Sequence, residues 1–352
     1  MGVSVDQLTG LLSASHAENF EKKWTDISQA RQEYFVINHL MGKGRKNVMG
    51  GKSYDYNVAY GRSGRAKSFG FYNTDNPSQS DKITQATVPL RLSGTDFSFD
   101  VNEEIFNKPD KVQILNLIEE RRHMAMLDLA EYMEDVGWGK PDSSTDKLTP
   151  YGVAYWIVKS TGKTDIGDCT FNGGNPSGFA DGAGGIDSDT ITSWKNWAGN
   201  YAAVTKADLI KKMRKAHHDT NFVSPISRST SYVPESVENR YQIFVNNTTM
   251  MSLEDVGEAQ NENLGRDLAP YDGQMLFRKN PIMQVPFLAD DSTNPVYFIN
   301  WDAFKIITQA DIFMKETVKP SGTQHTVVTK FIDLAWNTIC YDRRRLAVLS
   351  VG

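Results

Sequence analysis

Cysteine is scarce in this sequence, which has only Cys169 and Cys340 among its 352 residues. Two distant cysteines provide neither a disulfide framework nor the paired spacing of a zinc site. No apolar run approaches the ~18 residues that span a bilayer. The first fifteen residues lack the basic and apolar regions of a signal peptide. We therefore expect a soluble protein made in the cytoplasm, with no metal, no cofactor and no membrane partner.

Signatures of catalysis are missing as well. The sequence has no His-Glu-x-x-His motif and no nucleophile elbow, and His217 and His218 are adjacent, so a helix would point them in different directions. The glycine-rich stretch 171–187 reads FNGGNPSGFADGAGGID and lacks the Gly-Lys-Ser/Thr of a phosphate-binding loop. We interpret it as a plain surface loop. The sequence therefore gives no indication of an enzyme.

Positive charge is also in deficit, except in one place. The formal net charge is −5, but residues 42–67 hold seven cations, one acid and six glycines, and so carry +6. The rest of the chain then carries −11, which disfavours a general nucleic-acid-binding protein. The candidate contact residues in and around this stretch are Lys43, Arg45, Lys46, Lys52, Tyr54, Tyr56, Tyr60, Arg62, Arg65 and Lys67.

Alternating polar and apolar residues predict two strands at 53–60 and 87–100. Joined by the basic segment, they form an extended hairpin with too little apolar content to bury itself. We expect the hairpin to lie over a neighbouring copy of the chain, burying its tyrosines and placing its cations against acidic surface. The alternative is that the tyrosines stack on single-stranded bases. The acidic remainder of the chain favours the protein partner.

The clearest local element is a long helix at 109–136. Asn107 and Pro109 provide a cap and a first-turn proline, and Gly137 is expected to end the helix. An apolar stripe that includes Leu129 and Met133 recurs at three- and four-residue steps. The stripe is too broad for a coiled coil, so we expect the helix to pack across a sheet.

Further elements follow in both halves of the chain. Residues 30–41 form a helix or a strand. Helices are predicted at 206–217 and 248–264. The predicted strands are 151–159, 241–245, 282–285, 296–299, 303–307, 312–317, 326–339 and 345–351.

The order of these elements resembles the major capsid protein of tailed double-stranded-DNA bacteriophages, with the α+β Hong Kong 97-like fold. The closing stretch from His325, HTVVTKFIDLAWNTICYDRRRLAVLSVG, is similar to the long strand, charged turn and final strand that end such proteins. The stretches TKADLIKKMRKAHHDTNF, YQIFVNNTTMMSLEDV and RKNPIMQVPFL resemble that family's axial domain.

The resemblance implies a division of the chain: an N-terminal arm (1–41), an extended loop (42–100), a peripheral domain (101–204 and 301–352) with a spine helix at 109–136, and an axial domain (205–300). It implies self-assembly into hexamers and pentamers of an icosahedral head that encloses double-stranded DNA without sequence-specific binding. A separate scaffold protein, a portal and decoration proteins are the further partners implied, with the virion as the location.

Two rival functions remain open at this point. The first is an encapsulin-type nanocompartment shell, which shares the fold. The second, from a different class, is a nucleic-acid-binding protein that uses residues 42–67. For a shell subunit, we expect deletion of residues 44–66 to leave a folded protein that no longer assembles.

Overall fold

The computed structural model describes residues 34–41, 45–62, 64–72, 74, 81–102, 117–221, 241–262, 275–320 and 326–352. Most of the expected N-terminal arm, Lys43, and the expected helix start with Asn107 and Pro109 lie outside the described residues. Among the described residues, no helix is long and apolar enough to cross a membrane.

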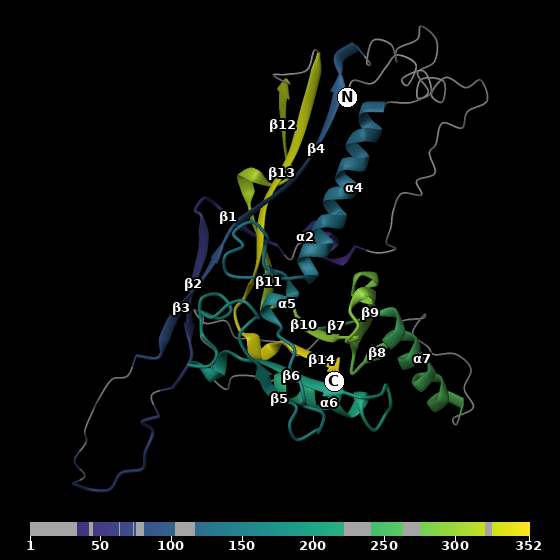
Figure 1. The fold of residues 1–352 in the computed structure, drawn as a ribbon. Helices are drawn as coiled ribbons and strands as arrows, with labels where there is room; N and C mark the ends of the chain where they lie inside the picture. The colour runs from purple at the N-terminus through teal and green to yellow at the C-terminus, as the bar shows by residue number, and fades with distance from the viewer. Residues whose placement is uncertain are drawn as a thin grey trace.

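Helix α4 (Leu117–Trp138) confirms the predicted long helix and lies beside the extended strands at the top of Figure 1. Leu129 and Met133 of its predicted stripe are buried. The prediction that Gly137 ends the helix is wrong. A Cβ at Gly137 would lie 2.7 Å from Cγ2 of Val36, so the glycine allows helix α2 (Phe35–Met41) to approach closely.

One sheet has five strands and is centred on the long strand β13 (Val327–Cys340). Antiparallel to β13 run β4 on one side and β11 and β12 on the other, and β1 pairs in parallel with β11. The bounds are β1 Lys46–Val48, β4 Arg91–Asp100, β11 Phe304–Gln309 and β12 Lys315–Pro320. The predicted strand at 312–317 is therefore shifted, because a short 3-10 turn, Ala310–Ile312, precedes β12.

The second sheet has seven strands in the order β5, β6, β14, β10, β7, β9, β8 (Figure 1). Two neighbouring pairs, β6 with β14 and β7 with β9, are parallel and the others are antiparallel. The bounds are β5 Thr170–Gly173, β6 Asn196–Tyr201, β7 Tyr241–Val245, β8 Leu276–Phe277, β9 Asn280–Gln284, β10 Val296–Asn300 and β14 Ala347–Val351.

The sheets do not divide where the sequence-based domain boundaries do. Strands β6 and β14 belong to the stretches expected in the peripheral domain, yet they sit inside the sheet that holds β7 and β10 from the expected axial domain. Two helices pack on this seven-stranded half of the molecule, α6 (Leu209–Thr220) and α7 (Asn247–Glu262). Both were predicted, with boundaries shifted by one to three residues.

Two apolar cores hold the described elements together. The first lies between α4, β11 and β13 and includes Leu129, Met133 and Trp336. The second lies between the seven-stranded sheet and helices α6 and α7, and includes Met213 and Leu253. Burial of such side chains stabilises a fold by about 1.5–3 kcal/mol each.

Two sequence predictions in the middle of the chain are wrong. The apolar run at 151–159 forms a short helix, α5 (Val153–Trp156), because periodicity does not separate a buried strand from a buried helical turn. The glycine-rich stretch is not a plain surface loop. Ala183 and Ile186 within it are buried, and the backbone carbonyl of Gly184 accepts a hydrogen bond from the amide of Thr87.

Candidate assembly surface

The extended hairpin is built from β2 (Ser53–Ala59) and β3 (Ile83–Pro89), paired antiparallel along their whole length. The sequence had merged β3 with β4, but the chain changes sheet at Leu90, between the two strands. Side chains alternate along the hairpin: Tyr56 and Val88 are buried, whereas the neighbouring Asp55, Asn57 and Thr87 are exposed. One face of the strands therefore lies on the hairpin's own subunit.

Tyr56 is fixed inside the subunit. Its hydroxyl donates a hydrogen bond of 2.6 Å to the backbone carbonyl of Cys340, and its ring meets that of Tyr341 edge-on at 5.3 Å. Burial holds the pKa of Tyr56 well above its usual value. The sequence expected this ring to be buried by a neighbouring copy, and the structure instead buries it within one chain.

Lys46 and Tyr54 form a polar cluster with Tyr341 at the base of the hairpin. The Lys46 ammonium donates to the hydroxyl of Tyr54 and, over 3.0 Å, to that of Tyr341. Burial lowers the pKa of Lys46, but these hydrogen bonds outweigh it and the net shift is upward. Burial raises the pKa of Tyr54, and the hydrogen bonds with Lys46 and Tyr341, together with the charge of Lys46, more than reverse that shift. The cluster ties β1 and β2 to the turn after β13.

The remaining expected contact residues divide by position. Arg45 lies over the ring of Phe313, 4.1 Å from its centroid, and so also contacts its own chain. Tyr60 is half-buried, and its backbone carbonyl accepts a hydrogen bond from Ser193. Lys52 is exposed at the other end of β2. Because β1 and β2 are integral to the subunit, deleting residues 44–66 would damage the fold as well as the contact.

Beyond Tyr60 the described residues of the stretch 61–81 form a loop tip that projects away from the rest of the subunit at the lower left of Figure 1. The described cations of this tip, Arg62, Arg65 and Lys67, are all exposed. Three aromatic side chains accompany them and were missed by the sequence reading. Their exposed fractions are 78% for Phe69, 100% for Phe71 and 105% for Tyr72.

Exposure of this kind is unusual for aromatic side chains, which normally contribute large buried areas. The signal was present in the sequence as SFGFYN, a run of aromatics inside a Gly- and Ser-rich stretch that directly follows the cations. The tip therefore presents both apolar rings and positive charge to whatever it contacts. Aromatic residues and arginine are both enriched in protein–protein interfaces, so the composition of the tip is typical of such an interface.

Two Gly-Lys-Ser/Thr tripeptides occur elsewhere in the chain, at 51–53 and 162–164. The first leads into strand β2, and the second lies in a loop between α5 and β5. A phosphate-binding loop needs this tripeptide at the start of a helix, where the backbone amides surround the phosphate. Neither tripeptide has that setting.

No protein-family model and no curated protein matches the sequence. Solved structures do match the fold. A cyanophage A-1(L) capsid chain aligns with a TM-score of 0.62 over 94% of this chain and 96% of its own length, at 12% identity. A capsid chain of a native GTA particle aligns with a TM-score of 0.53 over 94% and 95%, at 10% identity.

A third match, the capsid of cyanophage P-SCSP1u, has a TM-score of 0.53 and 11% identity over 94% of this chain and 93% of that one. Each alignment covers nearly the whole of both chains, so the similarity extends from the hairpin to the seven-stranded sheet. At 10–12% identity, the similarity establishes the fold alone. The chain therefore has the α+β, Hong Kong 97-like fold of phage capsid proteins that its sequence resembles.

Proposed function

We propose that this chain is a major capsid protein, a structural subunit that assembles with copies of itself into the hexamers and pentamers of an icosahedral phage head. The observation that carries the proposal is the loop tip, whose described aromatic and cationic side chains are exposed and whose backbone projects away from the rest of the subunit (Figure 1). A capsid-type fold with such a projection is suited to contact with neighbouring copies.

The energetics favour a second protein copy as the partner of the tip. Burying an exposed Phe or Tyr side chain contributes about 1.5–3 kcal/mol, whereas each exposed ion pair contributes roughly 0–1 kcal/mol. Phe69, Phe71 and Tyr72 therefore supply most of the affinity, and Arg62, Arg65 and Lys67 orient the contact. In a closed symmetric assembly such contacts repeat in every subunit, which makes the later contacts effectively intramolecular.

The same proposal assigns the remaining parts of the molecule. The extended loop, expected within residues 42–100, is formed by β2, β3 and the loop tip; α4 is the spine helix and the seven-stranded half surrounds the capsomer axis. The assembled shell belongs to the virion, is made in the host cytoplasm and encloses double-stranded DNA. A separate scaffold protein, a portal and decoration proteins complete the particle. The role is structural rather than catalytic.

The test is electron microscopy of the purified full-length chain, paired with a variant in which residues 62–80 are replaced by a short Asn-Gly turn. The strand ends are close enough for this turn, because the amide of Tyr60 donates to the carbonyl of Lys82 over 3.0 Å. We expect closed shells or capsomer rings from the natural chain, and a folded subunit without shells from the variant.

A natural chain that stays monomeric under all assembly conditions contradicts the proposal, and binding of single-stranded DNA with a steep salt dependence would instead support the nucleic-acid alternative. Shells that co-purify with a cargo enzyme, identified by mass spectrometry, would support a nanocompartment. Shells formed equally well by the shortened variant would show that the tip is not the contact.

A further inference from the structure

Helix α6 presents a row of basic side chains to solvent. Lys211, Arg214 and His218 recur at three- and four-residue steps and are all exposed, so they lie on one face of the helix. The opposite face, with Leu209, Met213 and Ala216, is buried against the seven-stranded sheet. Among the described residues, Lys211 and Arg214 have no carboxylate partner.

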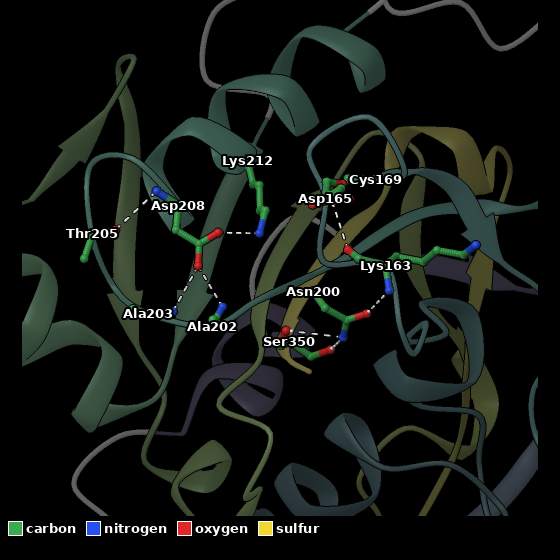
Figure 2. A network of polar contacts seen from close by, with 10 residues as sticks. All are labelled: Lys163, Asp165, Cys169, Asn200, Ala202, Ala203, Thr205, Asp208, Lys212 and Ser350. Carbon is green, nitrogen blue, oxygen red and sulfur yellow. Dashed lines mark hydrogen bonds and ion pairs between the residues drawn. The ribbon is translucent and has the colours of Figure 1, made fainter.

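The other two cations of α6 differ in that they are already paired inside the subunit. Lys212 is buried and forms an ion pair with Asp208, which also accepts hydrogen bonds from the amides of Ala202 and Ala203 (Figure 2). Lys215 pairs with Asp219 at 2.8 Å and donates to the backbone carbonyl of Cys169. The subunit thus uses its inward cations and leaves the outward stripe available.

A tight turn extends the stripe. Arg278 and Lys279 form the two-residue connection between β8 and β9, and both have left-handed backbones, with φ of 49° and 67°. Glycine and asparagine are the usual residues there, so two long cationic side chains in this geometry point to a function for the turn. Arg278 Nη1 donates to Nε2 of His218 over 2.8 Å, which joins the turn to α6. Lys211, Arg214, His218, Arg278 and Lys279 together form what we call the basic stripe.

Helix α7 presents the opposite charge. Asn247, Thr248, Met251, Glu254 and Asp255 are exposed and recur at helical spacing, and Leu253 on the other face is buried. The helix contains four acids and no cation. Glu254 and Asp255 have no cationic partner among the residues that the structure describes, and Met251, about one helical turn before them, is 58% exposed. These exposed residues form what we call the acidic stripe.

The two stripes occupy different parts of the same half of the molecule. Helix α6 packs on β6 and β14, whereas α7 packs on the 3-10 turn Pro286–Asp290. In Figure 1, α6 lies below the seven-stranded sheet and α7 lies at its β8 end. Two complementary surfaces at separate positions on one subunit form a head-to-tail contact between copies, the type of contact that closes into rings.

We infer that the basic stripe of one copy binds the acidic stripe of the next copy. Charge complementarity selects the partner: the basic stripe needs a surface that presents carboxylates, and the two exposed acids of α7 have no cationic partner within the described part of the chain. Met251 adds an exposed apolar side chain to the acidic stripe, about one helical turn before its two acids. The inference rests on the proposed self-assembly and adds a second contact, distinct from the loop tip.

Charge reversal tests the contact in the full-length chain. The basic reversal is Lys211→Glu with Arg214→Glu, and the acidic reversal is Glu254→Lys with Asp255→Lys. All four positions are exposed, so circular dichroism and thermal melting are expected to match the natural chain. We expect each reversal alone to lower the yield of rings or shells about tenfold or more, because it places like charges across every contact.

The fourfold variant that carries both reversals restores opposite charges and is expected to recover assembly. An equimolar mixture of the two reversals is expected to co-assemble with alternating copies, so even-numbered rings would contain equal amounts of each. Native mass spectrometry measures this stoichiometry. Exposed cations outside the stripe supply the matched control: Lys147→Glu with Lys206→Glu should leave the assembly yield unchanged.

Shells whose yield is insensitive to both reversals, or a folded fourfold variant that stays defective, would overturn this inference while leaving the proposed capsid function intact. Normal shells with less enclosed nucleic acid after the basic reversal would assign the stripe to a nucleic acid and overturn it as well. A natural chain that never self-associates would refute the capsid function and the contact together.

Discussion

The guanidinium of Arg343 donates a hydrogen bond of 2.9 Å to the backbone carbonyl of Trp156 inside the first core. Its other acceptors are also neutral: the carbonyls of Trp194 and Gly174 and the side-chain amide oxygen of Asn196. The side chain is fully buried, and burial lowers the pKa of Arg343 to about 10. One residue of the C-terminal turn thereby joins three segments that lie far away in the sequence.

Replacing Arg343 by Met is expected to lower the free energy of unfolding by about 3 kcal/mol or more. Each buried acceptor left without a partner costs about 1–3 kcal/mol, and the variant leaves several. The adjacent Arg344 supplies a matched control, because it is partly exposed and pairs with Asp342; Arg344→Met should cost roughly 0–1 kcal/mol. Urea unfolding of the unassembled subunit measures both. Equal losses of unfolding free energy in the two variants would show that the buried hydrogen bonds of Arg343 do not stabilise the fold more than an exposed ion pair does.

Because Gly137 lies close to Val36, we expect replacement of this helical glycine by alanine to lower the free energy of unfolding, which is the opposite of the usual effect. Alanine normally stabilises a helix by about 1 kcal/mol relative to glycine. At Gly137 the added Cβ would lie 2.7 and 2.8 Å from the two methyl carbons of Val36, so we expect Gly137→Ala to destabilise by about 1–3 kcal/mol.

The double variant Gly137→Ala with Val36→Ala tests the cause. Val36→Ala alone removes buried methyl groups and should also destabilise. Because it makes room for the new Cβ, the double variant should be more stable than the sum of the single effects predicts. Additive losses in chemical unfolding would mean that the overlap with Val36 is not the reason for the glycine.

The sequence predicted the long elements well because their patterns are local. The apolar stripe of α4 and the strand at Tyr241–Val245 can each be recognised from the pattern of residues within a single segment. The failures involve contacts between distant segments. Nothing near Gly137 in the sequence indicates that Val36 will lie against it, so a glycine at the end of an apolar pattern was interpreted as a stop signal.

The candidate site shows the same limit. Charge counting located the basic segment, but burial of Tyr56 depends on Cys340 and Tyr341, nearly three hundred residues away. Sequence alone therefore could not divide the segment into a base that packs on its own subunit and a tip that does not. The tip aromatics are visible in the sequence as SFGFYN, but the charge of the segment gives no indication of them.

Asp208 makes the stability of the seven-stranded half dependent on pH. Burial raises its pKa, but the hydrogen bonds from Lys212, Ala203 and Ala202 outweigh that and leave a net lowering. The pKa in the folded protein is therefore below the unfolded value of ~3.9. The stabilisation is present above the unfolded pKa and is lost as the pH falls through the folded pKa.

Asp208→Asn should thus reduce the free energy of unfolding at pH 7 by about 1.5 kcal/mol, the typical contribution of a charge-assisted hydrogen bond. The difference from the natural chain should shrink as the pH falls below about 4. Urea unfolding at pH 7, 5 and 3 measures it, with Asp165→Asn, at an exposed position, as the control. A difference that is constant with pH would mean that the charge of Asp208 is not responsible.

The tip aromatics allow assembly to be separated from folding. Phe71 and Tyr72 make no buried contacts within the described subunit, so Phe71→Ser with Tyr72→Ser should change its free energy of unfolding by less than about 0.5 kcal/mol. If a neighbouring copy buries both rings, their loss removes about 3 kcal/mol from each contact. We then expect the protein concentration needed for assembly to rise about a hundredfold, since 1.4 kcal/mol corresponds to a factor of ten. Light scattering across a concentration series measures this threshold concentration.

Leu148→Ser is the control, because Leu148 is 81% exposed in a different loop. If this variant raised the threshold concentration equally, any loss of surface hydrophobicity would weaken assembly and the tip would have no specific role.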